Sequence, residues 1–318
     1  MVSVHLESGR VEVRRQPLPR VPEGFARIRL LAAGICSTDL ELQRGYYGFS
    51  GTPGHEFVGE VVESPADPIW LGRRVAGEIN LACGRCEWCA RGVGRHCPHR
   101  TVLGIVKHPG AFREFLTLPI RNLHRVPDPI SSEHAAFIEP VAAACEILDQ
   151  IRIAKGTQVA VLGDGKLGLL IAQVLQAHGA KVLLFGRHPQ KMRLVEWSGV
   201  TAEVLADKVP QHAFPIVVDA TGSPEGLRAA MAMCEPRGTV VMKSTVHGLV
   251  PIDTAPAIVN EITLIGSRCG RFEPALELLE RGAIDVASLI SERMPLSQAP
   301  AAFEHAARQG VIKVLLTA

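Results

Sequence analysis

Four cysteines lie within fifteen residues of one another, as Cys83, Cys86, Cys89 and Cys97, in the pattern C-x2-C-x2-C-x7-C. Four thiolates this close together satisfy a tetrahedral zinc ion completely and leave no position for a substrate. We therefore predict a structural zinc site that pins a loop with little core of its own. A zinc ribbon that binds nucleic acid is the alternative, because four arginines occur between residues 85 and 100.

A second set of metal-binding residue types lies elsewhere in the chain and predicts an open site. A catalytic zinc needs three protein ligands and one exchangeable position. Cys36 and His55 are the leading candidates, and either Glu56 or Glu139 can complete the set. Asp39 follows Cys36 by three residues and is a candidate to accept the second ring N–H of His55. A single Cys or His is more often a packed core residue, so this prediction depends on the residues acting together.

A glycine-rich loop follows the apolar run 158–162 and precedes a helix expected over residues 166–177, for which Gly179 is the expected C-cap. This strand–turn–helix context is the one that a dinucleotide-binding G-x-G-x-x-G motif requires. The first glycine permits a tight turn, the second admits the pyrophosphate, and the third allows close helix packing. The expected cofactor-binding residues of the loop are Gly163, Gly165, Lys166, Leu167 and Gly168. A glycine turn without a ligand is the alternative.

The end of the next strand predicts which nicotinamide cofactor is used. NAD sites place Asp or Glu there, about 20 residues past the loop, to bind the ribose hydroxyls. This chain has Gly186, Arg187 and His188, with Lys191 close behind. The missing carboxylate and the added positive charge favour a 2′-phosphate, so we predict NADP(H) over NAD(H). The alternative is that these charges only decorate a solvated turn.

Composition excludes several classes of protein. The chain has 318 residues, of which 47 % are hydrophobic, and its formal charge is 34 − 32 = +2. This near balance gives no electrostatic case for nucleic acid or an anionic membrane as partner. The sequence begins without the apolar run of a signal peptide. It also contains no apolar run of ~20 residues, the length that spans a membrane. We therefore expect a cytoplasmic protein.

The pattern of apolar, Pro and Gly residues changes near residue 125, which indicates two domains. Before it, short β-branched or alternating runs are broken by Pro and Gly, which predicts a barrel-like all-β domain. Ser131 is expected to cap a helix through Glu139, which Pro140 perturbs or restarts. From Thr157 onward, strands alternate with helices, which predicts a parallel, doubly wound α/β sheet.

Taken together, the segments around Cys36 and His55, the four-cysteine lobe and the glycine loop resemble the zinc-containing medium-chain dehydrogenase/reductase superfamily. The resemblance covers essentially the whole chain, and the motifs occur in family order. It implies a GroES-like β-barrel catalytic domain over residues 1–141 and 267–318. A Rossmann domain over residues 142–266 interrupts it.

The resemblance also implies roles for single residues. Glu139 stands where simple alcohol dehydrogenases have a second Cys ligand, which is similar to the sorbitol, glucose and threonine dehydrogenase branch. Thr38 is expected to accept the substrate's hydroxyl proton, with Glu41 where relatives often have a proton-relay His. Asp39 completes the catalytic set beside the metal. Lys313 stands where relatives have a basic residue that contacts the cofactor phosphates.

These expectations define a zinc-dependent oxidoreductase that exchanges hydride between NADP(H) and a secondary alcohol, polyol or sugar. Two zinc ions per chain are expected, one catalytic and one structural, in a homodimer or homotetramer. A zinc-independent quinone reductase is a rival that would lack the metal residues. A non-catalytic zinc protein that binds NADPH as a redox sensor is a second rival.

Overall fold

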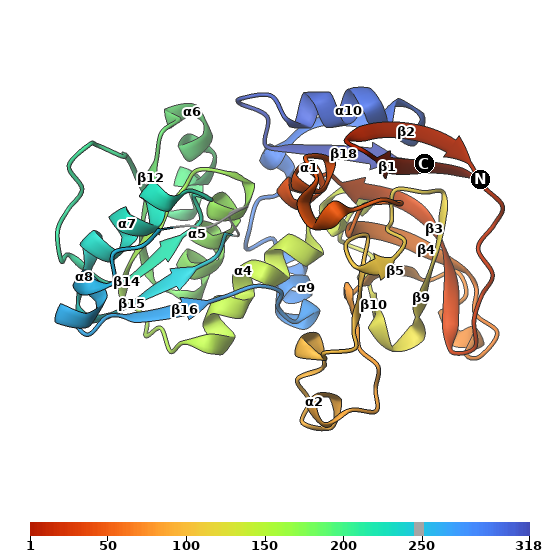
Figure 1. Cartoon of the computed structure of the whole chain (residues 1–318), viewed down its shortest axis with the longest axis horizontal. Helices are drawn as coiled ribbons and strands as arrows, with labels where there is room; N and C mark the ends of the chain where they lie inside the picture. Colours follow the sequence, from red (N-terminus) through yellow and green to blue (C-terminus); the bar gives the residue numbers. More distant parts are fainter. Residues whose placement is uncertain (245–250) are drawn as a thin grey trace. The chain divides into compact units, whose positions relative to one another are not determined.

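The computed structural model describes residues 1–244 and 251–318, and the chain divides into two compact units. One unit comprises Met1–Glu139 with Ile290–Ala318, and the other comprises Pro140–Leu289 (Figure 1). The sequence places the return to the first domain at residue 267, whereas residues 267–289 pack with the second unit. The amide of Gln173 explains part of this difference, because it bonds both backbone groups of Asp285, at 2.7 and 3.1 Å.

The first unit is built on a seven-stranded sheet whose central strand is β3 (Phe25–Gly34). Side chains of β3 alternate between buried and more exposed positions, as a strand with one face on a core requires. The other strands, in sheet order, are β10 (Leu123–Arg125), β5 (Arg74–Gly77), β4 (Glu56–Glu63), then after β3 β18 (Lys313–Thr317) and β17 (Ile290–Pro295), while β9 (Phe115–Pro119) also pairs with β3. This arrangement confirms the predicted GroES-like β domain.

Two smaller sheets complete the strands of this unit. A hairpin joins β1 (Val2–Glu7) to β2 (Arg10–Arg15), and three short strands form the other sheet. These are β6 (Asn80–Leu81), β7 (Thr101–Leu103) and β8 (Lys107–His108). Strand β1 alternates apolar and polar residues, although it was not among the predicted strands, and β17 has no clear strand pattern. The pairing of β18 with β3 sets Leu315 opposite Gly34, so the end of the chain lies beside the segment that leads to Cys36.

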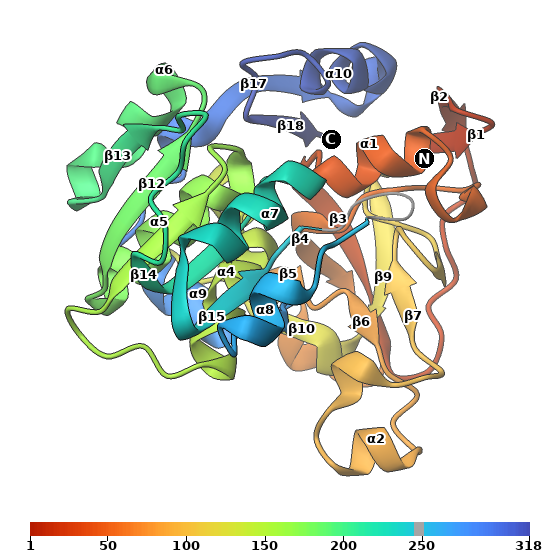
Figure 2. The same ribbon diagram turned by 60° about the vertical axis from the view of Figure 1, so that its left-hand side comes forward.

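The second unit contains a six-stranded sheet in which every pairing is parallel. Its order is β13 (Thr201–Val204), β12 (Lys181–Gly186), β11 (Gln158–Leu162), β14 (Phe214–Asp219), β15 (Cys234–Met242) and β16 (Thr263–Gly266). Strand β11 is buried from Val159 to Leu162, as expected for a central strand covered on both faces. Helices α5 (Lys166–His178) and α7 (Pro224–Met233) pack against the strands (Figure 2). The doubly wound Rossmann fold is therefore confirmed.

Local signals in the sequence account for the end of α5 and for the interruption between α3 and α4. Helix α5 ends at Gly179, whose φ of 103° is the left-handed C-cap that the sequence predicted. Ser131 caps α3 (Ser132–Ala135), but that helix is short. The sequence predicted that Pro140 perturbs or restarts the helix, and a second helix, α4 (Ile138–Gln150), does begin two residues before it. Pro140 falls in the first turn, where backbone N–H groups have no partner within the helix.

The remaining helices are α1 (Ser37–Gln43), α2 (Glu87–Ala90), α6 (Pro189–Met192), α8 (Ala255–Val259), α9 (Phe272–Glu280) and α10 (Ala299–Ala306). Across residues 1–244 and 251–318, no helix has the length and apolar character that crossing a membrane requires.

Candidate functional site

The four-cysteine lobe has the geometry of a zinc site. Sγ of Cys86 lies 3.5 Å from Sγ of Cys89 and 3.6 Å from Sγ of Cys97, and the Cys83–Cys89 distance is 3.9 Å. Four sulfurs about 2.3 Å from one zinc ion lie about 3.8 Å apart in a tetrahedron. These cysteines form no disulfide. The lobe therefore fits a closed tetrathiolate site, and it offers no further ligand position.

Backbone N–H groups in the lobe are directed at the sulfurs. The N–H of Arg85 lowers the pKa of the Cys83 thiol to about 6. The N–H groups of Cys83 and His99 lower the pKa of Cys97, chiefly that of Cys83. Such donors stabilise the thiolate form, which is the form that binds metal. The backbone therefore favours the anionic form at these two sulfurs. At Cys86 the N–H of Cys89 lowers the pKa, but burial and the neighbouring thiols outweigh it and raise the pKa to about 11.

The second cluster is assembled from two separate segments of the first unit. Cys36 is the N-cap residue of α1, and His55 and Glu56 stand at the start of β4. One ligand atom from each of these three residues lies within 4.8 Å of the others, and two of the residues are buried. A thiolate, an imidazole and a carboxylate form a donor set that zinc accepts. Three protein ligands leave the fourth position of a tetrahedron for a substrate.

Asp39 is the buried residue that holds this cluster together. Its Oδ2 accepts the backbone N–H of Cys36 at 2.8 Å, and its Oδ1 accepts that of Gly54 at 3.1 Å. Nδ1 of His55 lies 3.5 Å from the same Oδ1 and otherwise has no hydrogen-bond partner among the described residues. Asp39 is completely buried. It therefore fixes the backbone at Cys36 and at Gly54, and its role as the outer partner of His55 stays a prediction.

Glu56 has a partner that no local pattern in the sequence indicated. Its Oε2 bonds Nζ of Lys313, and both side chains are almost completely buried. Gly34 makes room for this pair, because a Cβ there would lie 2.6 Å from the carboxylate oxygen. Nζ of Lys313 also lies 5.5 Å from the ring centroid of Phe137. The contact between Lys313 and cofactor phosphates stays a prediction, since the structure shows its ammonium bonded to Glu56.

The field around the cluster favours positive charge. Burial lowers the pKa of His55, but Asp39 and Cys36 outweigh it and the pKa is raised well above its ordinary value. Burial likewise opposes the charge of Lys313, yet Glu56 and Cys36 raise its pKa. The carboxylates and the thiolate that raise these two pKa values are the anionic groups that a divalent metal ion also requires. Geometry and charge therefore both fit zinc.

Three other predicted site residues lie on neighbouring segments. Oγ1 of Thr38 is 3.8 Å from Sγ of Cys36, and Glu41 follows one turn later on α1, where Arg44 donates to it at 2.6 Å. Glu139, in the first turn of α4, is not one of the three clustered ligands in the described chain. Its role as a ligand stays a prediction, as do the roles of Thr38 and Glu41.

The glycine loop of the second unit has the three properties that its motif requires. Gly163 has a φ of 111°, and a Cβ there would lie 2.7 Å from a backbone oxygen of Ala220. A Cβ on Gly168 would lie 1.9 Å from the backbone oxygen of Gly163. Helix α5 can therefore pack this closely against the loop only with glycine at position 168. Gly165 has open space where its side chain would be. That space, at the N-terminus of α5, suits a pyrophosphate.

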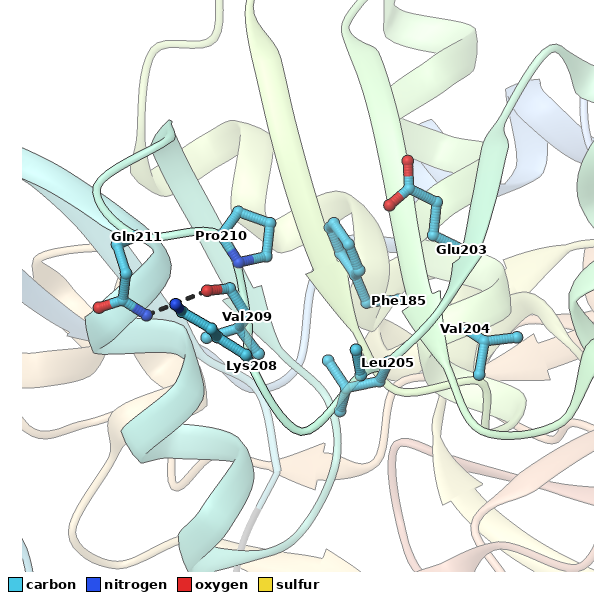
Figure 3. Close-up of a pocket in the computed structure, with 9 residues that line it drawn as sticks. Phe185, Glu203, Val204, Leu205, Lys208, Val209, Pro210 and Gln211 are labelled. Carbon is cyan, nitrogen blue, oxygen red and sulfur yellow. Dashed lines mark hydrogen bonds between the residues drawn. The ribbon is translucent and has the colours of Figure 1, made fainter.

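The predicted 2′-phosphate residues lie directly after β12. Arg187 is exposed, Lys191 and His188 are partly exposed, and Nδ1 of His188 lies 3.0 Å from Oδ2 of Asp164. Beside this turn, an open cavity of about 450 Å³ begins at Phe185 and Glu203 (Figure 3). Its lining is largely apolar and includes Leu205 and Val209. It therefore supplies no cluster of cations.

The sequence reasoning missed Asp164 and the pairing of Glu56 with Lys313. Asp164 occupies a variable position of the G-x-G-x-x-G motif, so the motif itself says nothing about it. Lys313 lies 257 residues from Glu56. One signal was available for Asp164, namely a carboxylate placed between two glycines of a loop that is expected to bind phosphate.

Comparison with known proteins finds family models that match each of the two units. The family model described as Alcohol dehydrogenase GroES-like domain matches residues 22–128, and the one described as Zinc-binding dehydrogenase matches residues 167–281. L-threonine 3-dehydrogenase of Streptomyces avermitilis is 32% identical, over 94% of this chain and 94% of its own. Sorbitol dehydrogenase of Halalkalibacterium halodurans is 27% identical, over 100% of this chain and 98% of its own.

A solved structure is equally similar. A zinc-binding dehydrogenase from Sinorhizobium meliloti 1021, bound to NADP, superimposes with a TM-score of 0.91 at 31% identity. The match covers 100% of this chain and 99% of that one. Similarity therefore extends over both units rather than over one shared domain.

Proposed function

The chain belongs to the zinc-containing medium-chain dehydrogenase/reductase family, and from this premise we propose that it oxidises a polyol or sugar-type secondary alcohol with NADP(H). The observation that carries the proposal is the cluster of Cys36, His55 and Glu56, held by a buried Asp39. Its three ligand types leave one position open, as a catalytic zinc requires. A second zinc would occupy the four-cysteine lobe, where it has no access to substrate.

Zinc bound by Cys36, His55 and a carboxylate would supply Lewis acidity that lowers the pKa of a substrate hydroxyl. Glu56 is the carboxylate that the clustered geometry favours, and Glu139 is the second candidate. Asp39 keeps His55 in the orientation that leaves its other nitrogen for the metal. Lys313 balances the charge of Glu56 in the buried interior.

Thr38 is the residue best placed to receive the hydroxyl proton, since its Oγ1 is 3.8 Å from the sulfur of Cys36. A hydroxyl accepts one proton while it donates its own, so Thr38 acts as a relay. Glu41 lies three residues later, on the same side of α1, and is the next acceptor on the way to solvent. Arg44 donates to Oε1 of Glu41 at 2.6 Å and so holds the carboxylate in place.

The glycine loop and the N-terminus of α5 would hold the cofactor, which accepts the hydride of the alcohol. Arg187, His188 and Lys191 lie where the 2′-phosphate of NADP(H) binds in such folds. The structural relative from Sinorhizobium meliloti is bound to NADP, which supports this choice. No carboxylate side chain projects from the end of β12, since Gly186 ends the strand.

The substrate class rests on the donor set and on the relatives. A carboxylate stands where simple alcohol dehydrogenases carry a second Cys. Relatives named for the oxidation of sorbitol and D-altritol match 100% and 92% of the chain. A polyol offers neighbouring hydroxyls that a carboxylate-bearing pocket can bind.

The test is zinc content together with a substrate screen. The purified chain should hold about two zinc ions, one for each donor set, and should reduce NADP⁺ with a member of a polyol, sugar and 3-hydroxy-amino-acid panel. Cys36→Ser should lose one zinc and the activity. A chain that binds NADPH and two zinc ions but turns over no alcohol would instead be a redox sensor.

A further inference from the structure

The carboxylate of Asp164 ties the glycine loop to the turn after β12. Its Oδ2 accepts the backbone N–H of Arg187 at 2.8 Å and that of His188 at 2.6 Å. The ring of His188 closes on the same group, with Nδ1 at 3.0 Å from Oδ2 and 3.2 Å from Oδ1. Asp164 is only 8% exposed. A buried carboxylate with three N–H neighbours is a built contact rather than a chance one.

Gly186 shows where this carboxylate lies relative to the position that selects the cofactor. A Cβ on Gly186 would meet Cβ of Asp164 at 2.6 Å, its Oδ2 at 2.7 Å, and Sδ of Met192 at 2.7 Å. The strand end therefore has no room for a side chain, because Asp164 already fills it. NAD sites use this place for an acid whose oxygens accept the ribose hydroxyls. Here the acid comes from the loop, and its oxygens accept backbone N–H groups.

The consequence for the turn is a fixed backbone and an available cation. Arg187 is exposed, and in the part of the chain that the structure describes its guanidinium makes no hydrogen bond or ion pair. The N–H groups around Asp164 offset the charge that would otherwise repel a phosphate. A backbone held at two consecutive N–H groups fixes the direction in which the side chain of Arg187 leaves the turn.

We propose that Asp164 is the positioning residue that makes this site select NADP(H): it holds the 187–188 turn and occupies the place of an NAD-type acid. This inference rests on the proposed function, because it takes the glycine loop to bind a nicotinamide dinucleotide. It assigns specificity to a residue that does not touch the 2′-phosphate. Arg187 would make that contact, and Asp164 would act through it.

The experiment uses fragments of the cofactor, so neither zinc nor turnover affects the result. Dissociation constants of adenosine 2′,5′-bisphosphate and of 5′-AMP are measured by isothermal titration calorimetry on the full chain. Their ratio reports only the 2′-phosphate. We expect the ratio to fall about tenfold or more in Asp164→Ala, the size typical of losing a hydrogen bond to a charged group. Asp164→Asn keeps one acceptor oxygen and should retain most of the preference.

Glu203→Ala is the matched control. It removes an exposed carboxylate from β13. Glu203 pairs with Phe185 across the strands and lines the cavity beside the turn (Figure 3), but its side chain has no hydrogen bond to Arg187 or His188 among the described residues. Its ratio should equal that of the parent chain. A merely structural role for Asp164 would weaken both fragments equally and leave the ratio unchanged, which would overturn the inference.

A double variant carries the acid back to the strand end. Asp164→Gly with Gly186→Asp clears the clash and restores an NAD-type carboxylate, so it should favour 5′-AMP over the bisphosphate. Gly186→Asp alone should weaken both fragments, because Asp164 still fills the space. If the parent chain does not prefer the bisphosphate, the proposed NADP preference fails and the inference with it. If the parent chain prefers it and Asp164→Ala does not change the ratio, only the inference fails.

Discussion

The two metal-binding regions of this chain are built in opposite ways. In the lobe, all four donors lie within fifteen residues, and the structure around them consists of the one-turn helix α2 and short turns. In the Cys36 cluster, the donors come from a helix start and a strand start, and the supporting lysine comes from the last strand of the chain. One region is local and the other depends on the whole first unit.

The comparison teaches which region needs its metal in order to keep its shape. The lobe has few apolar contacts of its own, so zinc supplies most of what holds it together. The cluster is held by the hydrogen bonds of Asp39, by the pair of Glu56 and Lys313, and by the pairing of β3 with β18. We therefore expect that loss of zinc unfolds the lobe, whereas at the Cys36 cluster it abolishes activity and leaves the fold intact.

Removing a ligand from the cluster should have the largest effect. Cys36→Ser should lower kcat/KM by about 10⁴-fold or more, which is about 5.4 kcal/mol at about 1.36 kcal/mol per tenfold. The protein should stay folded, as circular dichroism would show, and should hold one zinc fewer. Cys269→Ser, which removes a thiol outside both regions, should keep the parent activity. An unfolded Cys36→Ser chain would contradict the comparison.

Breaking the lobe should cost stability rather than chemistry. A bound ion at about 1,000 times its Kd adds about 4.1 kcal/mol to the free energy of unfolding, and Cys97→Ser should forfeit about that much. Trypsin should then cleave first at Arg91, inside the opened lobe. Zinc content, thermal melting and the masses of the fragments measure this. Cleavage outside residues 83–97 would show that the lobe is not a separate unit.

Lys313→Met tests whether the cluster is held together without metal. It leaves the buried carboxylate of Glu56 unpaired, which should lower the free energy of unfolding by about 3–5 kcal/mol. Urea unfolding measures the change. The double variant with Glu56→Met removes both charges and should recover most of the loss. A cost below about 1 kcal/mol, typical of exposed pairs, would mean that the pair is solvated.

Asp39→Asn should have the smallest effect, and it tests whether the metal affinity of the Cys36 cluster can be lowered without affecting the lobe. Changing an outer partner of a metal-binding His weakens metal affinity by about 10–100-fold. Competition with a chelator should show this loss for one zinc, while the zinc of the lobe keeps its affinity. Equal weakening of both zinc ions would mean that Asp39 acts through the stability of the whole unit.

Local signals in the sequence predicted much of this molecule. The cysteine spacing, the glycine loop and the C-cap at Gly179 each depend on residues a few positions apart. Their geometry follows from turn chemistry and from hydrogen bonds within one element. The alternation of strands and helices likewise predicted the parallel sheet, because each element carries its own pattern.

Tertiary structure decided the rest. Residues 267–289 stay with the second unit, and β17 joins its sheet with no clear strand pattern. In each case packing or pairing against distant residues outweighs the local preference.

The sequence by itself therefore determined the chemistry available to this protein: thiolates at zinc spacing, a Cys and a His for an open site, and a glycine loop for phosphates. Only the tertiary structure decided which groups support that chemistry. It brought Lys313 to Glu56 across 257 residues and set Asp164 against the turn at Arg187 and His188. The cysteine lobe and the glycine loop could be predicted because their residues lie a few positions apart in the chain. The charged residue that balances Glu56 comes from a distant part of the chain, and only the folded structure shows which residue it is.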